Sequence, residues 1–309
     1  MRVQLGAGSA WLAARFAPAG PSGSTKPGSG EAGSGTDLAW NLWQHNLHLR
    51  KVMYSGLEEK QVEPRDTDAS PVARNRRFYT AWWSAITVVS PERFNTWPLL
   101  SRLAESAGSR LEVGCGLHPR LPLAGTWFVD ISREGLTPLR AHSGLAIQAE
   151  ATALPFDSAS FDLVCAFDIV EHVADDQRLF GELSRVARPG APIVFSVPLH
   201  PGKWSVFDEL VGHVRRYDPG DLLSTLRAHD LVVERSATFG MAPRSRWLLH
   251  LAAWWMTRKP RLAMRWYDAA LRPLGLRLQR PLALAPGLID PEQVGEILLV
   301  CRRSGERDA

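Results

Sequence analysis

The sequence has few cysteines and no long apolar run. Its three cysteines, Cys115, Cys165 and Cys301, all lie in expected strands or at an expected turn. This placement suits reduced, buried thiols and argues against a disulfide framework or a zinc site. The longest largely apolar run, Trp247–Met256, is too short to cross a bilayer, which takes about 20 residues. We therefore expect a cytoplasmic protein, either free or peripheral to a membrane.

The N-terminal segment is poor in apolar residues. From Ala17 to Thr36 the chain consists mainly of Gly, Ser and Pro, which cannot bury enough apolar area to offset the entropy of ordering. We expect residues 1–52 to be disordered or of low complexity, without a signal peptide because the only apolar piece is brief and Arg15 interrupts its end. Met53 is an alternative start of translation. The remainder, with 45% apolar residues overall, can form a substantial core.

Apolar runs that end in glycine or an acidic residue recur in the middle of the chain. Leu111–Val113 leads into Gly114 and Gly116, a pattern that lets a buried parallel strand turn sharply and approach a ligand. Thr126–Asp130 ends in a carboxylate placed to accept hydrogen bonds from both hydroxyls of a ribose. Such strand ends meet at one edge of an open α/β sheet, where ligands bind. The pattern therefore indicates a nucleoside-containing ligand.

The ordered set of motifs resembles class I S-adenosylmethionine-dependent methyltransferases of the type 11 kind. The resemblance covers about residues 101–238 and the last strand, and it implies a doubly wound, seven-stranded, mostly parallel Rossmann-like sheet. The motifs that carry it are Glu112-x-Gly114-x-Gly116, Asp130-Ile131-Ser132, Ala149-Glu150-Ala151-x-x-Leu154-Pro155-Phe156, Phe161-Asp162-Leu163-Val164, Asp168-Ile169-Val170-Glu171-His172-Val173 and Arg188-Pro189-Gly190.

The resemblance implies how the chain would bind S-adenosylmethionine. Gly114, Cys115 and Gly116 would pass close to the methionine part, and Glu112 would help to orient its ammonium group. Asp130 would hold the ribose. Glu150 and the backbone amide of Ala151 would read the adenine edge, while two apolar side chains line the slot around the base, namely Ile131 and Phe167.

The glycine turn can also be compared with that of another nucleotide-binding class, the nicotinamide-dependent dehydrogenases. The third glycine that this family often has is replaced by His118, followed by Pro119 and Pro122, so we expect a short or distorted first crossover helix. A nicotinamide-dependent dehydrogenase also uses Gly-x-Gly before a helix. Asp130, however, follows Gly116 by only 14 positions (130 minus 116), whereas the dinucleotide fingerprint places its acid about 20 residues on. The spacing favours the methyltransferase reading.

The chemistry is expected after the fourth strand, at Asp168 and His172. His172 is the candidate general base, and the alternative is a structural histidine packed under the next helix. Asp168, Glu171 and His172 also resemble an acid-x-x-acid-His pattern that holds a divalent ion in some ubiquinone-pathway and small-RNA methyltransferases, although those carry glutamate in place of the aspartate. A further ligand would come from one of two histidines, His200 or His213. We predict no metal in the primary reading and keep this one as an alternative.

The acceptor is expected to meet the loop after the fifth strand and the N-terminal cap. His213, Arg215 and Tyr217 are candidate acceptor contacts. The alternative is that Arg215 and Arg216 are solvated or pair with Asp208 and Glu209. From Pro71 to Ala107 the pattern is helical. This cap contains three aromatic residues near its start, Tyr79, Trp82 and Trp83. They either contact the substrate, with Trp82 the main candidate, or anchor the cap as part of its core.

More than fifty residues separate the expected sixth and seventh strands. Residues 241–282 hold nine Lys or Arg and a single acid, Asp268, along with four tryptophans. This basic amphipathic hairpin suits an anionic membrane surface, and the alternatives are a dimer interface or a lid over the substrate pocket. Its large apolar share disfavours nucleic acid.

We therefore expect five segments. They are residues 1–52, a helical cap at 53–108, the cofactor-binding core at 109–240, the insertion at 241–293, and the last strand and tail at 294–309. The expected function is methyl transfer to a small-molecule or lipid-like acceptor, at oxygen. One alternative is a metal-assisted O-methyltransferase, and a second is a non-catalytic module that binds the cofactor.

Overall fold

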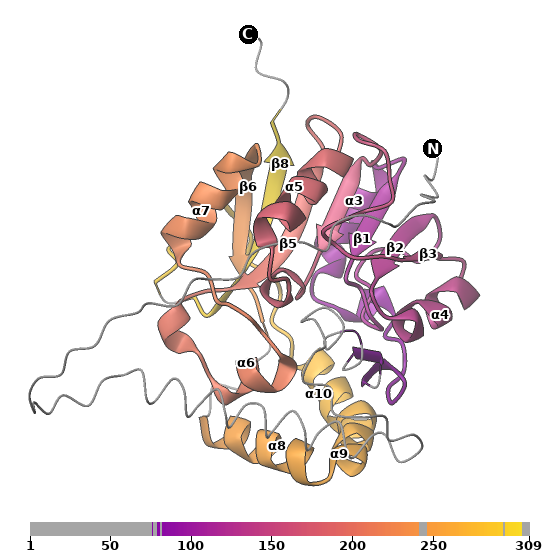
Figure 1. Ribbon diagram of the computed structural model, residues 1–309, viewed down its shortest axis with the longest axis vertical. Coiled ribbons are helices and arrows are strands. Elements are labelled where there is room, and N and C mark those ends of the chain that lie inside the picture. Colours follow the sequence, from indigo (N-terminus) through magenta and orange to yellow (C-terminus); the bar gives the residue numbers. More distant parts are fainter. Residues whose placement is uncertain (1–75, 77–78, 81, 241–245, 293, 305–309) are drawn as a thin grey trace, which may run out of the picture.

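The computed structural model describes residues 76, 79–80, 82–240, 246–292 and 294–304 (Figure 1). The expectations for residues 1–52, and for the cap as far as residue 75, lie outside the described residues. Within the cap, residues 76, 79–80 and 82–83 are helical, and a 3-10 turn η1 (Pro91–Arg93) follows.

One eight-stranded sheet in the order β3-β2-β1-β4-β5-β8-β6-β7 organises the fold. The first five strands are parallel, and β8 runs antiparallel between β5 and β6. The strands are β1 (Arg110–Val113), β2 (Thr126–Asp130), β3 (Leu145–Gln148), β4 (Leu163–Ala166), β5 (Pro192–Pro198), β6 (Leu231–Thr238), β7 (Ala285–Pro286) and β8 (Glu296–Arg303). This confirms the doubly wound, mostly parallel sheet. The eighth strand is the two-residue β7, which the insertion adds at the edge beside β6.

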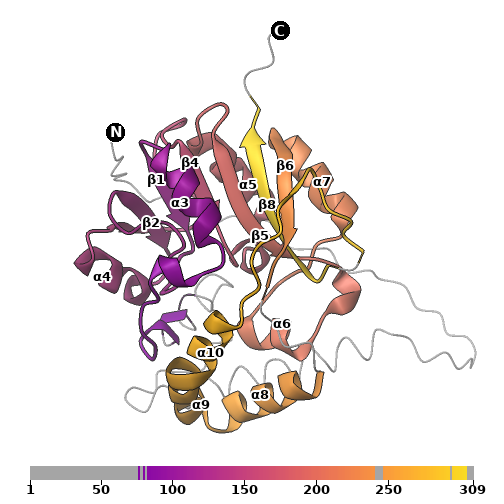
Figure 2. The same ribbon diagram turned by 180° about the vertical axis from the view of Figure 1, so that it is seen from behind.

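Helices cover both faces of the sheet, as the near-continuous apolar strands require. Val164 and Ala166 of β4 pack in the cluster that includes α5 (Asp176–Val186) and α7 (Pro219–Ala228). Cys165 packs on the opposite face beneath α3 (Trp97–Glu105), which Figure 2 shows from behind. A further helix, α4 (Arg133–Ala141), buries Leu136 and Leu139 against Phe128 of β2. The three cysteines are free and buried, as expected.

The crossover from β1 to β2 is a loop over its whole length. The sequence predicts a short or distorted helix here, whereas residues 114–125 contain no helix at all. Glu112 is buried at the end of β1, and its carboxylate accepts from the backbone amides of Arg120 (2.9 Å) and Leu121 (2.9 Å). Pro119 and Pro122 have no amide hydrogen and disfavour a helix here. The amides of Arg120 and Leu121 are satisfied by Glu112 in place of helical hydrogen bonds.

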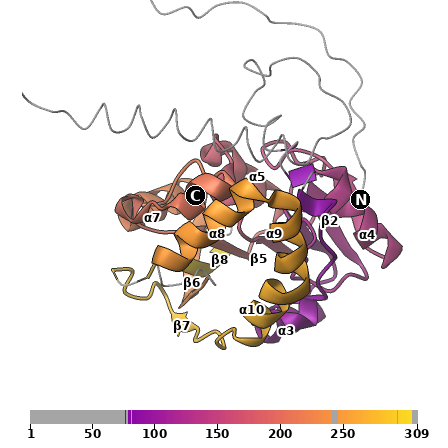
Figure 3. The ribbon, with the colours of Figure 1, turned by 90° about the horizontal axis from the view of Figure 1, so that it is seen from below.

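The insertion forms four short helical elements beneath the C-terminal ends of the parallel strands (Figures 1 and 3). They are α8 (Arg246–Arg258), α9 (Pro260–Trp266), the π-helical turn η4 (Tyr267–Leu271) and α10 (Arg272–Arg277). Arg272 donates to the carbonyl of Thr87 (2.6 Å), and Asn95 of the cap donates to the carbonyl of Arg280 (2.8 Å). The insertion therefore packs against the cap. No helix in the described ranges is both long enough and apolar enough to cross a membrane.

Candidate functional site

The turn after β1 and the end of β2 are tied together by one carboxylate. Gly114 and Gly116 have φ angles of 73° and 49°, which favour glycine. The backbone amide of Gly116 donates to Asp130 Oδ2 (2.9 Å), and the amide of Ser132 donates to Oδ1 (2.8 Å). Burial raises the pKa of Asp130 to about 6, although these backbone hydrogen bonds oppose the shift. Asp130 is thus a buried acceptor at the edge of the sheet.

The residues at this edge fit a nucleoside. Each oxygen of Asp130 accepts a hydrogen bond from a backbone amide, that of Gly116 or Ser132, and a second lone pair on it could accept from a ribose hydroxyl. Ile131 is half-buried beside it, Glu150 is exposed beyond β3, and Ala151 is buried. The edge therefore offers carboxylates for hydroxyl and amino groups next to apolar side chains for a ring.

One side chain expected at the cofactor, that of Phe167, lies on the opposite face of the sheet from Ala151. Phe167 packs on the face of the sheet that α3 covers, and its ring centroid lies 6.1 Å from that of Phe239. Side chains alternate between the two faces along a strand, so residue 167, just after β4, shares the face of Cys165. The structure does not bring it together with Ala151, which packs in the cluster on the other face. The carboxylate of Glu112 is occupied by the backbone of the 114–125 loop, so its role toward an ammonium group stays a proposal. Cys115 is buried, and its thiol pKa is raised by that burial.

Asp168 turns toward a buried arginine. At φ 52°, it accepts from Ser196 Oγ (2.7 Å) and from Arg120 Nη2 (3.2 Å). The Arg120 guanidinium lies 3.8 Å from the centroid of the Phe94 ring. Glu296 at the start of β8 hydrogen-bonds to Asp168, and its pKa is raised by burial and by the nearby carboxylates of Asp168 and Glu171. The sequence offers no signal for Arg120 or Glu296, since neither belongs to a motif.

A second group gathers three side chains whose ligand atoms lie within 4.8 Å of one another, Glu171, His172 and His213. His213 Nε2 is 3.7 Å from Glu171 Oε1, and its Nδ1 is 2.8 Å from Asp208 Oδ1. Glu171 Oε2 is buried and has no hydrogen-bond partner among the described residues. Burial, followed by the charge of Asp168, raises the pKa of Glu171. Asp168 and His200 do not join this cluster, and His200 Nε2 instead contacts the carbonyl of Pro291 (2.8 Å).

The cap connects the glycine turn to this cluster. Tyr79 Oη lies 3.1 Å from His172 Nε2, and the Tyr79 ring stacks on Trp83 at 5.7 Å. Trp83 in turn covers Gly116, because a Cβ atom built on that glycine would lie 2.2 Å from the indole. Trp82 packs against Tyr267 of the insertion, with the two ring centroids 6.1 Å apart.

The three acceptor candidates in the loop after β5, His213, Arg215 and Tyr217, do not lie together in the structure. Tyr217 is buried and donates to Asp176 (2.6 Å), and Arg215 forms an ion pair with the same carboxylate, so neither faces an acceptor. Arg216 pairs with Asp208 (2.7 Å), as the structural alternative predicts. Burial alone would raise the pKa of Asp208, yet hydrogen bonds from His213, Arg216 and Ser205 hold it well below its usual value. Of the three candidates in this loop, only His213 lies in the site.

Comparisons with known proteins agree with this arrangement. Residues 111–195 match a family model described as a methyltransferase domain. A ubiquinone biosynthesis O-methyltransferase of Hahella chejuensis is 29% identical over 147 residues, covering 42% of this chain and 62% of that protein. A demethylmenaquinone methyltransferase of Roseiflexus is 29% identical over 124 residues, covering 34% and 52%. The chain thus spans about half to three fifths of the length of these relatives. Among solved structures, a SAM-dependent methyltransferase of Thermotoga maritima has a TM-score of 0.46 at 12% identity, covering 86% of this chain and 96% of that one.

Proposed function

Because residues 111–195 form a class I S-adenosylmethionine-dependent methyltransferase domain, we propose that this protein transfers a methyl group to a hydroxyl of a small or lipid-like acceptor. The observation that carries the proposal is that one segment of the cap, residues 79–83, contacts both the turn held by Asp130 and the side chain of His172. Trp83 covers the turn that Asp130 holds, and Tyr79, stacked on Trp83, contacts His172. A cofactor edge and a candidate base are therefore linked through the contacts of Tyr79 and Trp83.

The chemistry asks little of the protein. When bound, S-adenosylmethionine supplies a methyl group on a positively charged sulfur, which is already activated for displacement. The chain must hold the acceptor oxygen in line and take its proton. His172 is the candidate base, because it follows the end of β4 and its Nε2 lies 3.1 Å from the Tyr79 hydroxyl oxygen. Tyr79 donates its proton to the carbonyl of Val211 (3.2 Å), so its oxygen can accept a hydrogen bond from the histidine ring.

The acceptor class is proposed from the insertion and from the names of the relatives. Two of those proteins are named for ubiquinone and demethylmenaquinone, both quinones. In this chain Trp254 and Trp266 are 56% and 55% exposed on α8 and α9, beside the exposed cations Arg258 and Lys259. Such a surface suits an anionic bilayer, from which an acceptor with an apolar tail could enter. A dimer interface is the alternative use of this surface.

A vesicle assay tests the membrane contact. We expect wild-type protein to sediment with vesicles that contain phosphatidylglycerol, in a salt-sensitive manner, and not with neutral vesicles. Trp254→Ser, Trp266→Ser, Arg258→Glu and Lys259→Glu together should abolish that binding. The matched control carries Arg178→Glu and Arg227→Glu on α5 and α7 and should still bind. Equal sedimentation of all three proteins would exclude the insertion as the contact.

Metal-assisted transfer is a second candidate, favoured by the cluster of Glu171, His172 and His213. Its carboxylate and two imidazoles are ligands that divalent transition metals accept, and the unpartnered Glu171 Oε2 is buried within it. Asp208 contacts His213 Nδ1 (2.8 Å) and fixes the ring, as carboxylates commonly do for metal-bound histidines. A divalent ion there would lower the pKa of an acceptor hydroxyl.

One activity measurement separates the three functions. Purified protein is incubated with methyl-labelled cofactor and quinol or phenol acceptors, before and after treatment with chelator. Simple base catalysis predicts labelled product that chelator does not affect and that His172→Ala reduces at least about 100-fold. The metal alternative predicts loss with chelator and recovery with added divalent ion. Cofactor binding without product on any acceptor would indicate a non-catalytic module.

A further inference from the structure

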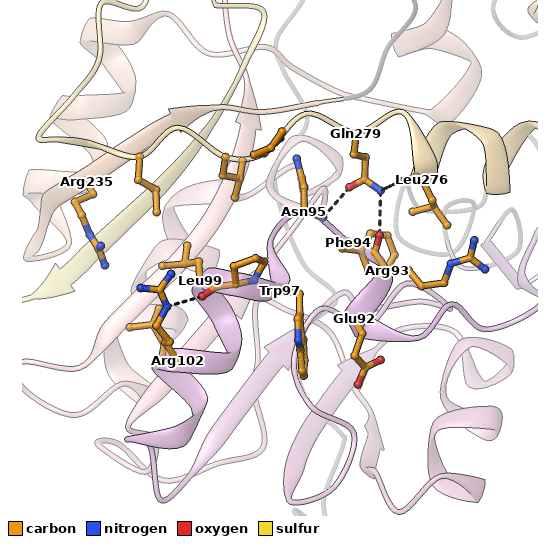
Figure 4. Close-up of a pocket in the computed structure, with 15 residues that line it drawn as sticks. Glu92, Arg93, Phe94, Asn95, Trp97, Leu99, Arg102, Arg235, Leu276 and Gln279 are labelled. Atoms are coloured by element: carbon orange, nitrogen blue, oxygen red, sulfur yellow. Dashed lines mark hydrogen bonds between the residues drawn. The ribbon is translucent and has the colours of Figure 1, made fainter.

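A cavity of about 480 Å³ lies away from the cofactor edge, between α3 and the end of the insertion (Figure 4). Its walls come from η1 and the two residues after it, one side of α3, one residue of β6, Leu276 of α10, and residues 279–284. This volume falls within the usual range of small-molecule pockets. The apolar lining consists of Phe94, Trp97, Pro98, Leu99, Leu103, Leu276, Pro281, Leu282 and Leu284.

The walls of this cavity are held by hydrogen bonds between the cap and the insertion. Gln279 Oε1 accepts from the amide of Asn95 (2.9 Å), and Gln279 Nε2 donates to the carbonyl of Arg93 (3.3 Å). Figure 4 shows both contacts across the opening. Phe94 lines the cavity, and its ring also contacts the Arg120 guanidinium that pairs with Asp168. The cavity is therefore a built feature that adjoins the functional site.

The charged lining is predominantly positive. Arg93, Arg102 and Arg235 line the cavity, against one acid, Glu92, which accepts from Ser90. Within the described part of the chain, no carboxylate lies at ion-pair distance from any of these three arginines. Arginine pairs with carboxylate or phosphate through two parallel hydrogen bonds. The three guanidinium groups therefore leave capacity for an anion.

A β-bulge places one of these arginines. The register between β6 and β8 shifts between Val233 and Arg235, so that Arg235 pairs with Val300, a residue of the core under α3. The extra residue, Glu234, pairs with Arg302 (3.0 Å), which neutralises its charge. Bulges commonly re-aim a side chain in this way. Here the bulge brings a cation, the Arg235 side chain, to the cavity wall.

We propose that this cavity binds an amphipathic anion, an alkyl chain with a carboxylate or phosphate head. The chain lies against Trp97, Leu103 and Leu284, and the head pairs with Arg102 and Arg235. Such a head can belong to a free amphiphile or to a membrane lipid, and both present the same chemistry to the arginines. The site is separate from methyl transfer, so it stands whether or not the proposed acceptor is correct.

Titration calorimetry with dodecyl phosphate below its micelle concentration tests the site. We expect saturable binding to the wild-type protein, at least tenfold weaker binding of dodecyl maltoside, which has the same chain and a neutral head, and none of inorganic phosphate. Arg102→Glu with Arg235→Glu should weaken dodecyl phosphate binding at least tenfold. Arg178→Glu with Arg227→Glu, on the opposite face of the sheet, is the charge-matched control and should bind as wild type.

Two further measurements show whether each variant is folded and which kind of amphiphile the cavity binds. Arg102→Gln with Arg235→Gln removes the charge without reversing it and should also weaken binding, and unchanged cofactor affinity shows that each variant is folded. Vesicles containing phosphatidylglycerol identify the source: binding lost by the arginine variants assigns a lipid headgroup, and binding retained assigns a free amphiphile. No binding of dodecyl phosphate to wild type, or equal binding to the arginine and control variants, overturns the proposal.

Discussion

Asp208 fixes the orientation of the His213 ring, with 2.8 Å between Asp208 Oδ1 and His213 Nδ1. The carboxylate is fully buried and charged, so it holds the proton on Nδ1 and leaves Nε2 directed toward Glu171 at 3.7 Å. His213 thus reaches the site with one defined nitrogen. Its partner is only five residues away in sequence, yet no familiar motif marks the pair.

Replacing Asp208 tests whether this orientation matters for the reaction. Asp208→Asn keeps the size of the side chain, and we expect kcat to fall about 10- to 100-fold because the ring loses its fixed tautomer. Cofactor affinity should not change. Glu209→Gln, the adjacent acid in α6 (Val206–Val211), is the matched control and should retain kcat. A normal kcat in Asp208→Asn would exclude His213 from the chemistry.

Cofactor affinity should depend on pH through Asp130. Its pKa is raised to about 6, and a neutral carboxyl accepts weaker hydrogen bonds than a carboxylate. If only the ionised form binds well, affinity should fall roughly tenfold between pH 7 and pH 5. Calorimetry at several pH values measures this. Asp130→Asn cannot titrate, so its weaker binding should be flat over the same range, and a parallel decline in both proteins would contradict the assignment.

Glu112 should make folding stability fall as pH rises. Burial raises its pKa from 4.5 to about 7, so the folded state holds a proton that the unfolded state releases. The contribution is fully present below pH 4.5 and is lost as pH rises through about 7, a change of about 3 kcal/mol. Urea unfolding from pH 4.5 to 8 should show a shallower decline for Glu112→Gln than for wild type. Glu105→Gln, exposed at the end of α3, should follow wild type.

Trp83 should report cofactor binding, because its indole covers Gly116 at the cofactor edge. We expect a change in tryptophan fluorescence on adding the cofactor that Trp83→Phe reduces by more than half. Trp82→Phe is the control, since Trp82 packs against Tyr267 and should keep the signal. Equal changes in both variants would place the cofactor away from this turn.

The sequence predicts the parts of the site that lie at strand ends. Gly114, Gly116 and Asp130 follow apolar runs that could only be buried parallel strands, and such strands deliver their C-terminal ends to one edge. His172 lies four residues after Asp168, which follows the end of β4, and its position can be predicted in the same way. The local pattern therefore predicts the glycine turn and the position of His172, whereas the doubly wound sheet is what the family resemblance implies.

The parts that depend on long-range packing could not be predicted. Tyr217 follows an arginine pair in a loop, which suggested a substrate contact, yet its ring is buried and its hydroxyl satisfies Asp176. Glu296 and Arg120 come from opposite ends of the core and meet at Asp168 only through the tertiary fold. The alternation of side chains along β4 also turned Phe167 to the face opposite Ala151, which a motif without register does not specify.

Calorimetric titration of S-adenosylmethionine into three proteins tests the central claim most directly. The account predicts micromolar binding to wild type, the same binding to Asp157→Ala, which removes an exposed carboxylate in the loop before β4, and at least tenfold weaker binding to Asp130→Ala. Thermal unfolding of each variant verifies that it is folded. Absence of binding to wild type, or binding to folded Asp130→Ala with unchanged affinity, would contradict the placement of the cofactor at this edge.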